Sequence, residues 1–144
     1  MIEQDTIRLL RECDAGVKMG ISSIDEVFDY TKDEKLRKRL SYCKSQHEEL
    51  AEEMQSLLDK YQDEGKSPNP FTKGMARIKT EVKLAVNESD STVAELMTDG
   101  CNMGVKYLNK YLNEYKAADE VSKDIVKRLI KLEEKLAEDI RQFL

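Results

Sequence analysis

The spacing of apolar residues constrains the fold of this chain more than any other feature. Over residues 36–61, apolar side chains recur at alternating intervals of four and three, with one polar break. The positions in this register are Leu36, Leu40, Cys43, His47, Leu50, Met54, Leu57 and Tyr61. This rhythm turns one face of a helix toward partner helices. The stretch therefore predicts a long helix in an all-α bundle.

Similar spacings and turn residues divide the rest of the chain into helices. We predict helices over residues 5–30, 36–62, 71–86, 90–116 and 120–144. The connections at 31–33 and 117–119 are short, so each joins two antiparallel neighbours. The stretch 63–70 is rich in glycine and proline and forms the clearest break. We expect one domain, residues 1–144, in which two helical hairpins are joined by a crossover with a short helix.

The two hairpins resemble each other in sequence. A shift of 84 residues aligns the first helix of each hairpin, and a shift of 86 aligns the second helix of each. The aligned pairs include Gly16 with Gly100, Gly20 with Gly104, and His47 with Glu133. Glycine inside a helix costs ~1 kcal/mol relative to alanine. The four glycines therefore predict close approach between helices.

Polar residues interrupt the apolar faces at a similar depth in each hairpin. The predicted layer contains Asp14, Cys43, His47, Cys101 and Glu133. One interpretation is a metal site of Asp14, His47 and Glu133, with Cys43 as a further ligand, because inward acids and histidine bind metals in bundles. Another is a buried hydrogen-bonded cluster in which His47 pairs with Asp14 or Glu133 and titrates with pH. A third is a cysteine nucleophile activated by His47. We favour the hydrogen-bonded cluster, because multi-ligand metal sites need more donors.

Charge and motifs exclude several classes of function. The net charge of −5 argues against general nucleic-acid binding. No apolar run approaches the ~20 residues of a membrane span, and the first residues lack a signal-peptide core. Three cysteines without a CxxC pair indicate reduced thiols and a cytoplasmic protein. No phosphate-binding loop, HExxH or nucleophile elbow supports nucleotide or hydrolase chemistry.

The predicted helix over 71–86 is locally basic. Its cationic residues are Lys73, Arg77, Lys79 and Lys83. Such a helix is either a connector with solvated lysines or a surface for an anionic partner. We favour the connector, because the helix has one aromatic residue and is a weak membrane signal.

Short motifs in a fixed order suggest a family. They are Cys13-Asp14-Ala15-Gly16, Gly74-x-x-Arg77 with Lys83-Leu84, Glu88-Ser89-Asp90 before Leu96, and Asp99-Gly100. From Ile7 to Leu144, the chain resembles the ferritin-like superfamily, and within it a bacterial family of small ferritin-like domains of unknown function. The resemblance implies a ferritin-like four-helix bundle with an additional crossover helix.

The resemblance also implies a di-iron centre that is largely lost. Iron-binding members carry a Glu in the first and third bundle helices and a Glu-x-x-His in the second and fourth. His47 matches one such histidine, but Lys44 stands in place of its glutamate. In the last helix Glu133 stands in place of the histidine, and Ile130 in place of the glutamate.

We therefore expect a non-catalytic protein without a cofactor that self-associates as a homo-oligomer or binds a protein partner. The alternative is a metal-binding or redox protein with a reduced site around His47 and Glu133, holding iron, manganese or zinc.

Overall fold

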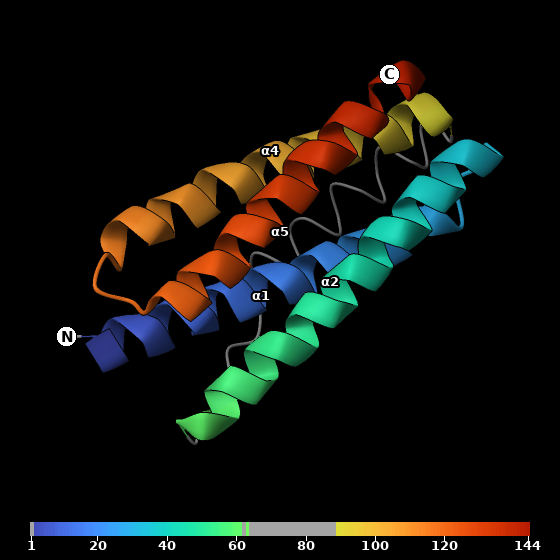
Figure 1. Ribbon diagram of the computed structural model, residues 1–144. Coiled ribbons are helices and arrows are strands. Elements are labelled where there is room, and N and C mark those ends of the chain that lie inside the picture. The colour runs from blue at the N-terminus through green and yellow to red at the C-terminus, as the bar shows by residue number, and fades with distance from the viewer. Residues whose placement is uncertain (1, 62, 64–88) are drawn as a thin grey trace.

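The computed structural model describes residues 2–61, 63 and 89–144. These residues form four α-helices, a terminal 3₁₀ turn and no strand (Figure 1). The elements are α1 (Ile2–Phe28), α2 (Glu34–Lys60), α4 (Asp90–Glu114), α5 (Glu120–Asp139) and η1 (Arg141–Phe143). Within this part of the chain, no helix is both long enough and apolar enough to cross a membrane. The prediction of an all-α helical bundle is confirmed, whereas the predicted short helix over 71–86 falls outside the described residues.

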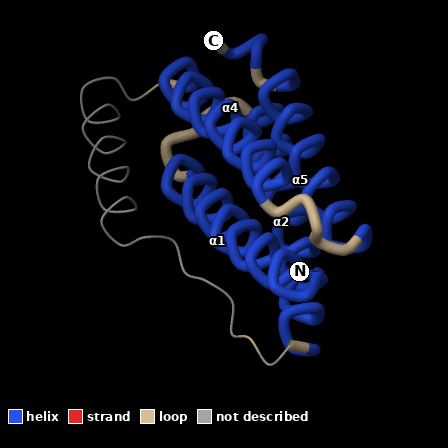
Figure 2. Tube along the Cα trace, turned by 90° about the vertical axis from the view of Figure 1, so that its left-hand side faces the viewer, coloured by secondary structure: helices blue, strands red, loops and turns tan. Residues whose placement is uncertain are grey.

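The helices form two antiparallel hairpins that pack side by side. α1 packs mainly on α2 and α4 mainly on α5, while contacts between α2 and α5 and between α1 and α4 join the hairpins (Figures 1 and 2). The first residue of α4 lies at the α1–α2 turn, because the Asp90 carboxylate accepts hydrogen bonds from the backbone N–H groups of Lys32 and Asp33. Therefore α4 starts at the end of the bundle where α2 starts, and the two helices run in the same direction.

The two hairpins hold each other's turns through equivalent contacts. Asp90, at the start of α4, accepts from the Asp33 N–H at 3.1 Å. Thr6, near the start of α1, accepts from the Asp119 N–H at 2.9 Å. The shift of 84 residues places Thr6 on Asp90, and the shift of 86 places Asp33 on Asp119. The sequence repeat is therefore also a repeat of contacts, related by an approximate two-fold axis.

For the four described helices, the predicted ends agree with the structure to within about two residues except at the two termini, since α5 ends at Asp139 rather than at 144 and α1 begins before residue 5. Asp33, Ser89 and Asp119 cap α2, α4 and α5 by accepting hydrogen bonds from N–H groups of the first turn. α1 already begins at Ile2, so Asp5 lies inside the helix. Its carboxylate accepts instead from the Ala117 N–H at the α4–α5 turn, at 3.1 Å.

The apolar core falls into two clusters along the bundle. Near the start of α1, the first contains Leu9, Leu10, Cys13, Val17, Leu50, Met54, Leu58, Leu108, Ala118, Ile125, Val126, Leu129 and Ile130. Toward the end of α1, the second contains Ile24, Val27, Leu36, Leu40, Cys43, Val93, Met97, Cys101, Leu136 and Ile140. Along α2 the boundary falls between Cys43 and Leu50, which is where His47 lies. The polar break in the pattern thus separates two apolar cores.

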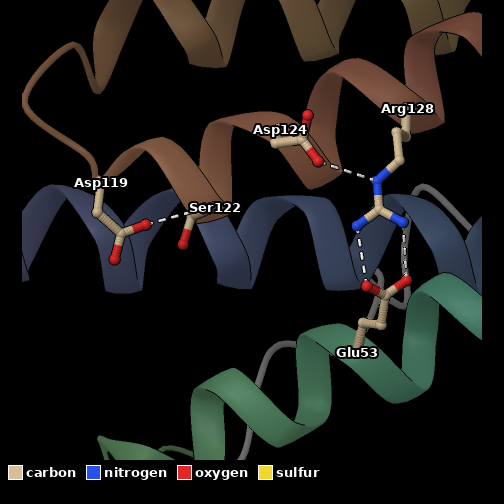
Figure 3. A network of polar contacts seen from close by, with 5 residues as sticks. All are labelled: Glu53, Asp119, Ser122, Asp124 and Arg128. Carbon is tan, nitrogen blue, oxygen red and sulfur yellow. Dashed lines mark hydrogen bonds and ion pairs between the residues drawn. The ribbon is translucent and has the colours of Figure 1, made fainter.

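A surface ion pair adds to the contact between α2 and α5. Both terminal nitrogens of Arg128 donate to the carboxylate of Glu53, at 2.9 and 3.0 Å (Figure 3). Asp124, one turn before Arg128, contacts its Nε at 3.2 Å. The side chains of Arg128 and Glu53 are nearly half exposed, and exposed ion pairs contribute ~0–1 kcal/mol to stability. The pair therefore supports the helix contact without determining it.

Candidate functional site: a buried histidine–glutamate pair

His47 lies in the interior of the bundle with both ring nitrogens in contact with oxygen. Its side chain is 1% exposed. Nε2 lies 2.8 Å from Oε1 of Glu133 on α5, and Nδ1 lies 2.8 Å from the backbone oxygen of Cys43 on α2. The sulfur of Cys43 lies 3.5 Å from Nδ1. The predicted pairing of His47 with Glu133 therefore joins the two hairpins.

The partners of the ring determine its protonation. A peptide oxygen accepts but never donates a hydrogen bond, so Nδ1 carries a hydrogen. When Glu133 is ionised its oxygens also accept, so Nε2 donates to the carboxylate, whereas a protonated Glu133 would donate to a neutral ring. With hydrogen on both nitrogens the ring is an imidazolium. The contact is therefore a charge-assisted hydrogen bond between buried opposite charges.

The pKa of His47 follows from two opposing effects. Burial disfavours the charged ring, but the hydrogen bonds to Cys43 and Glu133 and the negative charge of Glu133 outweigh it and raise the pKa of the imidazole to about 10. His47 is therefore positively charged at neutral pH.

The four bundle helices all contribute to the surroundings of this pair. Gly20 on α1 faces the histidine, since a Cβ built there would lie 2.8 Å from the ring atoms Cδ2 and Nε2. Gly104 on α4 faces the glutamate, and a Cβ there would lie 3.5 Å from Cδ of Glu133. The equivalent glycines of the repeat thus cover the equivalent residues His47 and Glu133.

The prediction of close approach is correct at Gly20, whereas a Cβ at Gly104 would make an ordinary van der Waals contact with Glu133. Gly20 and Gly104 leave room for the buried pair, which sequence reasoning had not connected with them. At Gly16 and Gly100, however, an added Cβ would meet nothing within 4 Å among the described residues, so close approach is not found there. The sequence repeat could have indicated this contact, because its shift of 84 aligns Gly20 with Gly104 and its shift of 86 aligns His47 with Glu133.

Two of the buried thiols, Cys13 and Cys101, are not activated. Burial, and after it the charge of Glu133, raise the pKa of the Cys101 thiol, and a hydrogen bond to Glu133 acts in the same direction. Burial and the neighbouring Asp14 raise the pKa of Cys13. A nucleophilic cysteine requires a lowered pKa and access to solvent. The buried thiols Cys13 and Cys101 therefore lack the properties of a nucleophile.

Asp14 is buried, as predicted, and it lies beside a lysine of the same helix. Its carboxylate forms an ion pair with Nζ of Lys18, one turn further along α1, at 2.7 Å. The groups that raise the pKa of His47 are Cys43 and Glu133, and Asp14 is not among them. The i, i+4 spacing of Asp14 and Lys18 was the available signal for this pairing. Of the three proposed ligands, the structure brings together His47 and Glu133.

The residues present do not fit a multi-ligand metal centre. Metal sites in bundles gather at least three protein donors around one point. Within the described residues, no three His, Cys, Asp or Glu side chains are arranged to hold a metal ion. Nδ1 of His47 faces a backbone oxygen, and Nε2 is in direct contact with Glu133. No step is therefore derived through a di-iron centre.

Comparison with known proteins adds no family. No protein-family model matches the chain, and neither a curated protein nor a solved structure is significantly similar to it. The resemblance to small ferritin-like domains thus stays a prediction from sequence motifs.

We predict opposite effects of alanine at two glycines one turn apart in α1. Gly20→Ala places a methyl group 2.8 Å from a ring fixed by two hydrogen bonds. The free energy of unfolding should fall by ~1–3 kcal/mol. Gly16→Ala meets open space and should raise it by up to ~1 kcal/mol. Urea unfolding of both variants measures the difference, and equal stabilisation by the two alanines would contradict the packing of Gly20 on His47.

We predict that stability falls as pH rises above neutrality. The folded pKa of His47 is about 10, above its unfolded value of ~6.5. The contribution of protonated His47 to the stability of the fold is therefore complete below pH ~6.5, and it is lost as pH rises through about 10. Between pH ~6.5 and ~8.5, before most unfolded thiols ionise, the free energy of unfolding should fall by up to ~1.4 kcal/mol per pH unit.

Glu133→Gln is the control for this pH dependence. It keeps a hydrogen-bonding group but removes the charge that raises the pKa of His47, so the slope should become shallower. Urea unfolding at several pH values gives the slope for both proteins. Identical slopes would mean that the ion pair does not determine the pH dependence.

Proposed function

We propose that this protein is a non-catalytic ferritin-like bundle that acts by self-association or by binding a protein partner, with a largely lost di-iron site. The observation that carries the proposal is the direct contact between His47 and Glu133. The two groups expected to hold a metal bind each other, and the second ring nitrogen of His47 faces a backbone oxygen. The pair therefore holds the two hairpins together and leaves no donor directed at a substrate.

The surroundings of the pair support this role. Apolar clusters lie on both sides along the bundle, and Gly20 and Gly104 cover the pair from α1 and α4. Catalysis needs a site that reacting groups can enter. Here His47 is 1% exposed and Glu133 is 12% exposed. Contacts with other molecules are then made by the outer surface of the helices.

The direction of the helices supports the ferritin-like assignment. α2 and α4 run in the same direction, so the end of α2 and the start of α4 lie at opposite ends of the bundle. Simple up-down-up-down bundles have antiparallel helices at this point, whereas ferritin-like folds have one long crossover connection.

The metal content of the purified protein tests this function. We expect substoichiometric iron, manganese and zinc in protein purified without added metal or chelator, measured by inductively coupled plasma mass spectrometry. About one equivalent of metal, lost in Glu133→Ala and retained in Asp124→Ala, would instead establish the alternative metal-binding function. Asp124 is a suitable control, because it is an exposed acid on the same helix. Circular dichroism would show whether each variant keeps its helices.

A further inference from the structure

The outer face of α4 combines exposed apolar side chains with a separation of charge. Met103 is 59% exposed and Tyr107 is 39% exposed, one turn apart. Asp99 is exposed on the N-terminal side of Met103, and Lys106 and Lys110 are exposed on its C-terminal side. Steps of three and four residues place Asp99, Met103, Lys106 and Lys110 along one stripe of the helix. We call these four residues and Tyr107 the α4 stripe.

The α4 stripe is not a consequence of the internal repeat. In α1, Ala15 is the equivalent of Asp99, Ser22 of Lys106, and Ser23 of Tyr107. The equivalent of Met103 is Met19, which is half-buried rather than exposed. The two hairpins therefore share their interior contacts but differ on this surface, so the fold does not require the α4 stripe.

The charges of the α4 stripe are complementary to those of a second α4 in antiparallel orientation. A two-fold axis crossing the helix near Asn102 and Met103 places Asp99 of one copy opposite Lys106 of the other, and the symmetry repeats this pair. Met103 of both copies then lies beside the axis, and Tyr107 lies about one turn from it, so both side chains lose contact with water. A parallel arrangement would instead place Asp99 on Asp99 and Lys106 on Lys106, which is unfavourable. The pattern thus selects a two-fold symmetric partner with the same sequence.

The tyrosine and glycine beside this stripe fit the same partner. Tyr107 stacks with Tyr111 at 6.4 Å between ring centroids, and Tyr111 stacks with Tyr115 at the same distance. These contacts hold the ring of Tyr107 at the surface. Gly100 lies one turn before Gly104, and a Cβ added there meets nothing within 4 Å. Gly100 is exposed and carries no side chain, so a neighbouring helix can approach the backbone beside Met103.

We infer that the protein forms a two-fold symmetric homodimer through antiparallel packing of the α4 stripe, centred on Met103. This inference rests on the proposed function and names a second copy of the chain as the partner. One helix from each copy forms the contact, so the dimer is weak and depends on concentration.

Sedimentation equilibrium over a range of concentrations tests the dimer. The wild-type protein should shift from monomer to dimer, and Met103→Glu should remain monomeric because it buries a charge at the axis. Tyr42→Glu is the matched control, since Tyr42 is 63% exposed on α2 and lies outside the stripe. It should dimerise like the wild type. A monomer at every concentration, or a dimer that Met103→Glu leaves unchanged, would overturn the inference.

Charge exchange tests the antiparallel register. Asp99→Lys places two lysines opposite each other twice in the dimer and should weaken association about tenfold. The double variant Asp99→Lys with Lys106→Glu restores opposite charges and should recover association. Failure of the double variant to recover would overturn the register. Thermal unfolding should be nearly unchanged in both, because the replaced side chains are exposed.

The two proposals fail in different ways. A metal-free protein that stays monomeric would overturn the homodimer and keep the non-catalytic bundle. A protein that holds stoichiometric metal in its core would overturn the proposed function whatever its oligomeric state.

Discussion

The hydrogen bond between His47 and Glu133 is the interaction on which the arrangement of the two hairpins depends. It joins α2 to α5 at the boundary between two apolar clusters. A buried ion pair adds little net stability, because both groups lose their hydration, but leaving either one without its partner is strongly unfavourable. Alternative packings of two similar hairpins that separate the groups are therefore disfavoured. The pair specifies how the hairpins fit more than it adds to their stability.

The internal repeat explains why this contact lies where it does. Equivalent residues of the two hairpins meet near an approximate two-fold axis, as His47 and Glu133 do, or exchange places across it, as Thr6 and Asp90 do at the two turns. The same position of the repeat is thus occupied by histidine in the first hairpin and by glutamate in the second. Opposite charges result where two identical side chains would have faced each other. The contacts of the repeat lie in the interior and at the turns, so they do not constrain the outer surfaces, and the exposed residues of α4 differ from those of α1.

The sequence predicts the helices and the central contact because both depend on spacing. The rhythm of four and three defined the long helices, and the shift that aligns His47 with Glu133 predicted their equivalence. Spacing alone does not show which partner a buried acid takes. Asp14 lies at a core-facing position, yet Lys18 one turn away forms an ion pair with it. Nor does spacing distinguish Gly20, which faces a ring, from Gly16, which faces open space.

The most direct test of the central claim is the protonation state of the single histidine. Nitrogen-15 NMR of the imidazole distinguishes a ring with hydrogen on both nitrogens from either neutral tautomer, and His47 is the only histidine in the chain. A ring that is ion-paired with Glu133 is doubly protonated at pH ~8, where an ordinary histidine with a pKa of ~6.5 is neutral. A neutral ring at that pH, with one nitrogen lacking hydrogen, would contradict a buried ion pair at the centre of the bundle.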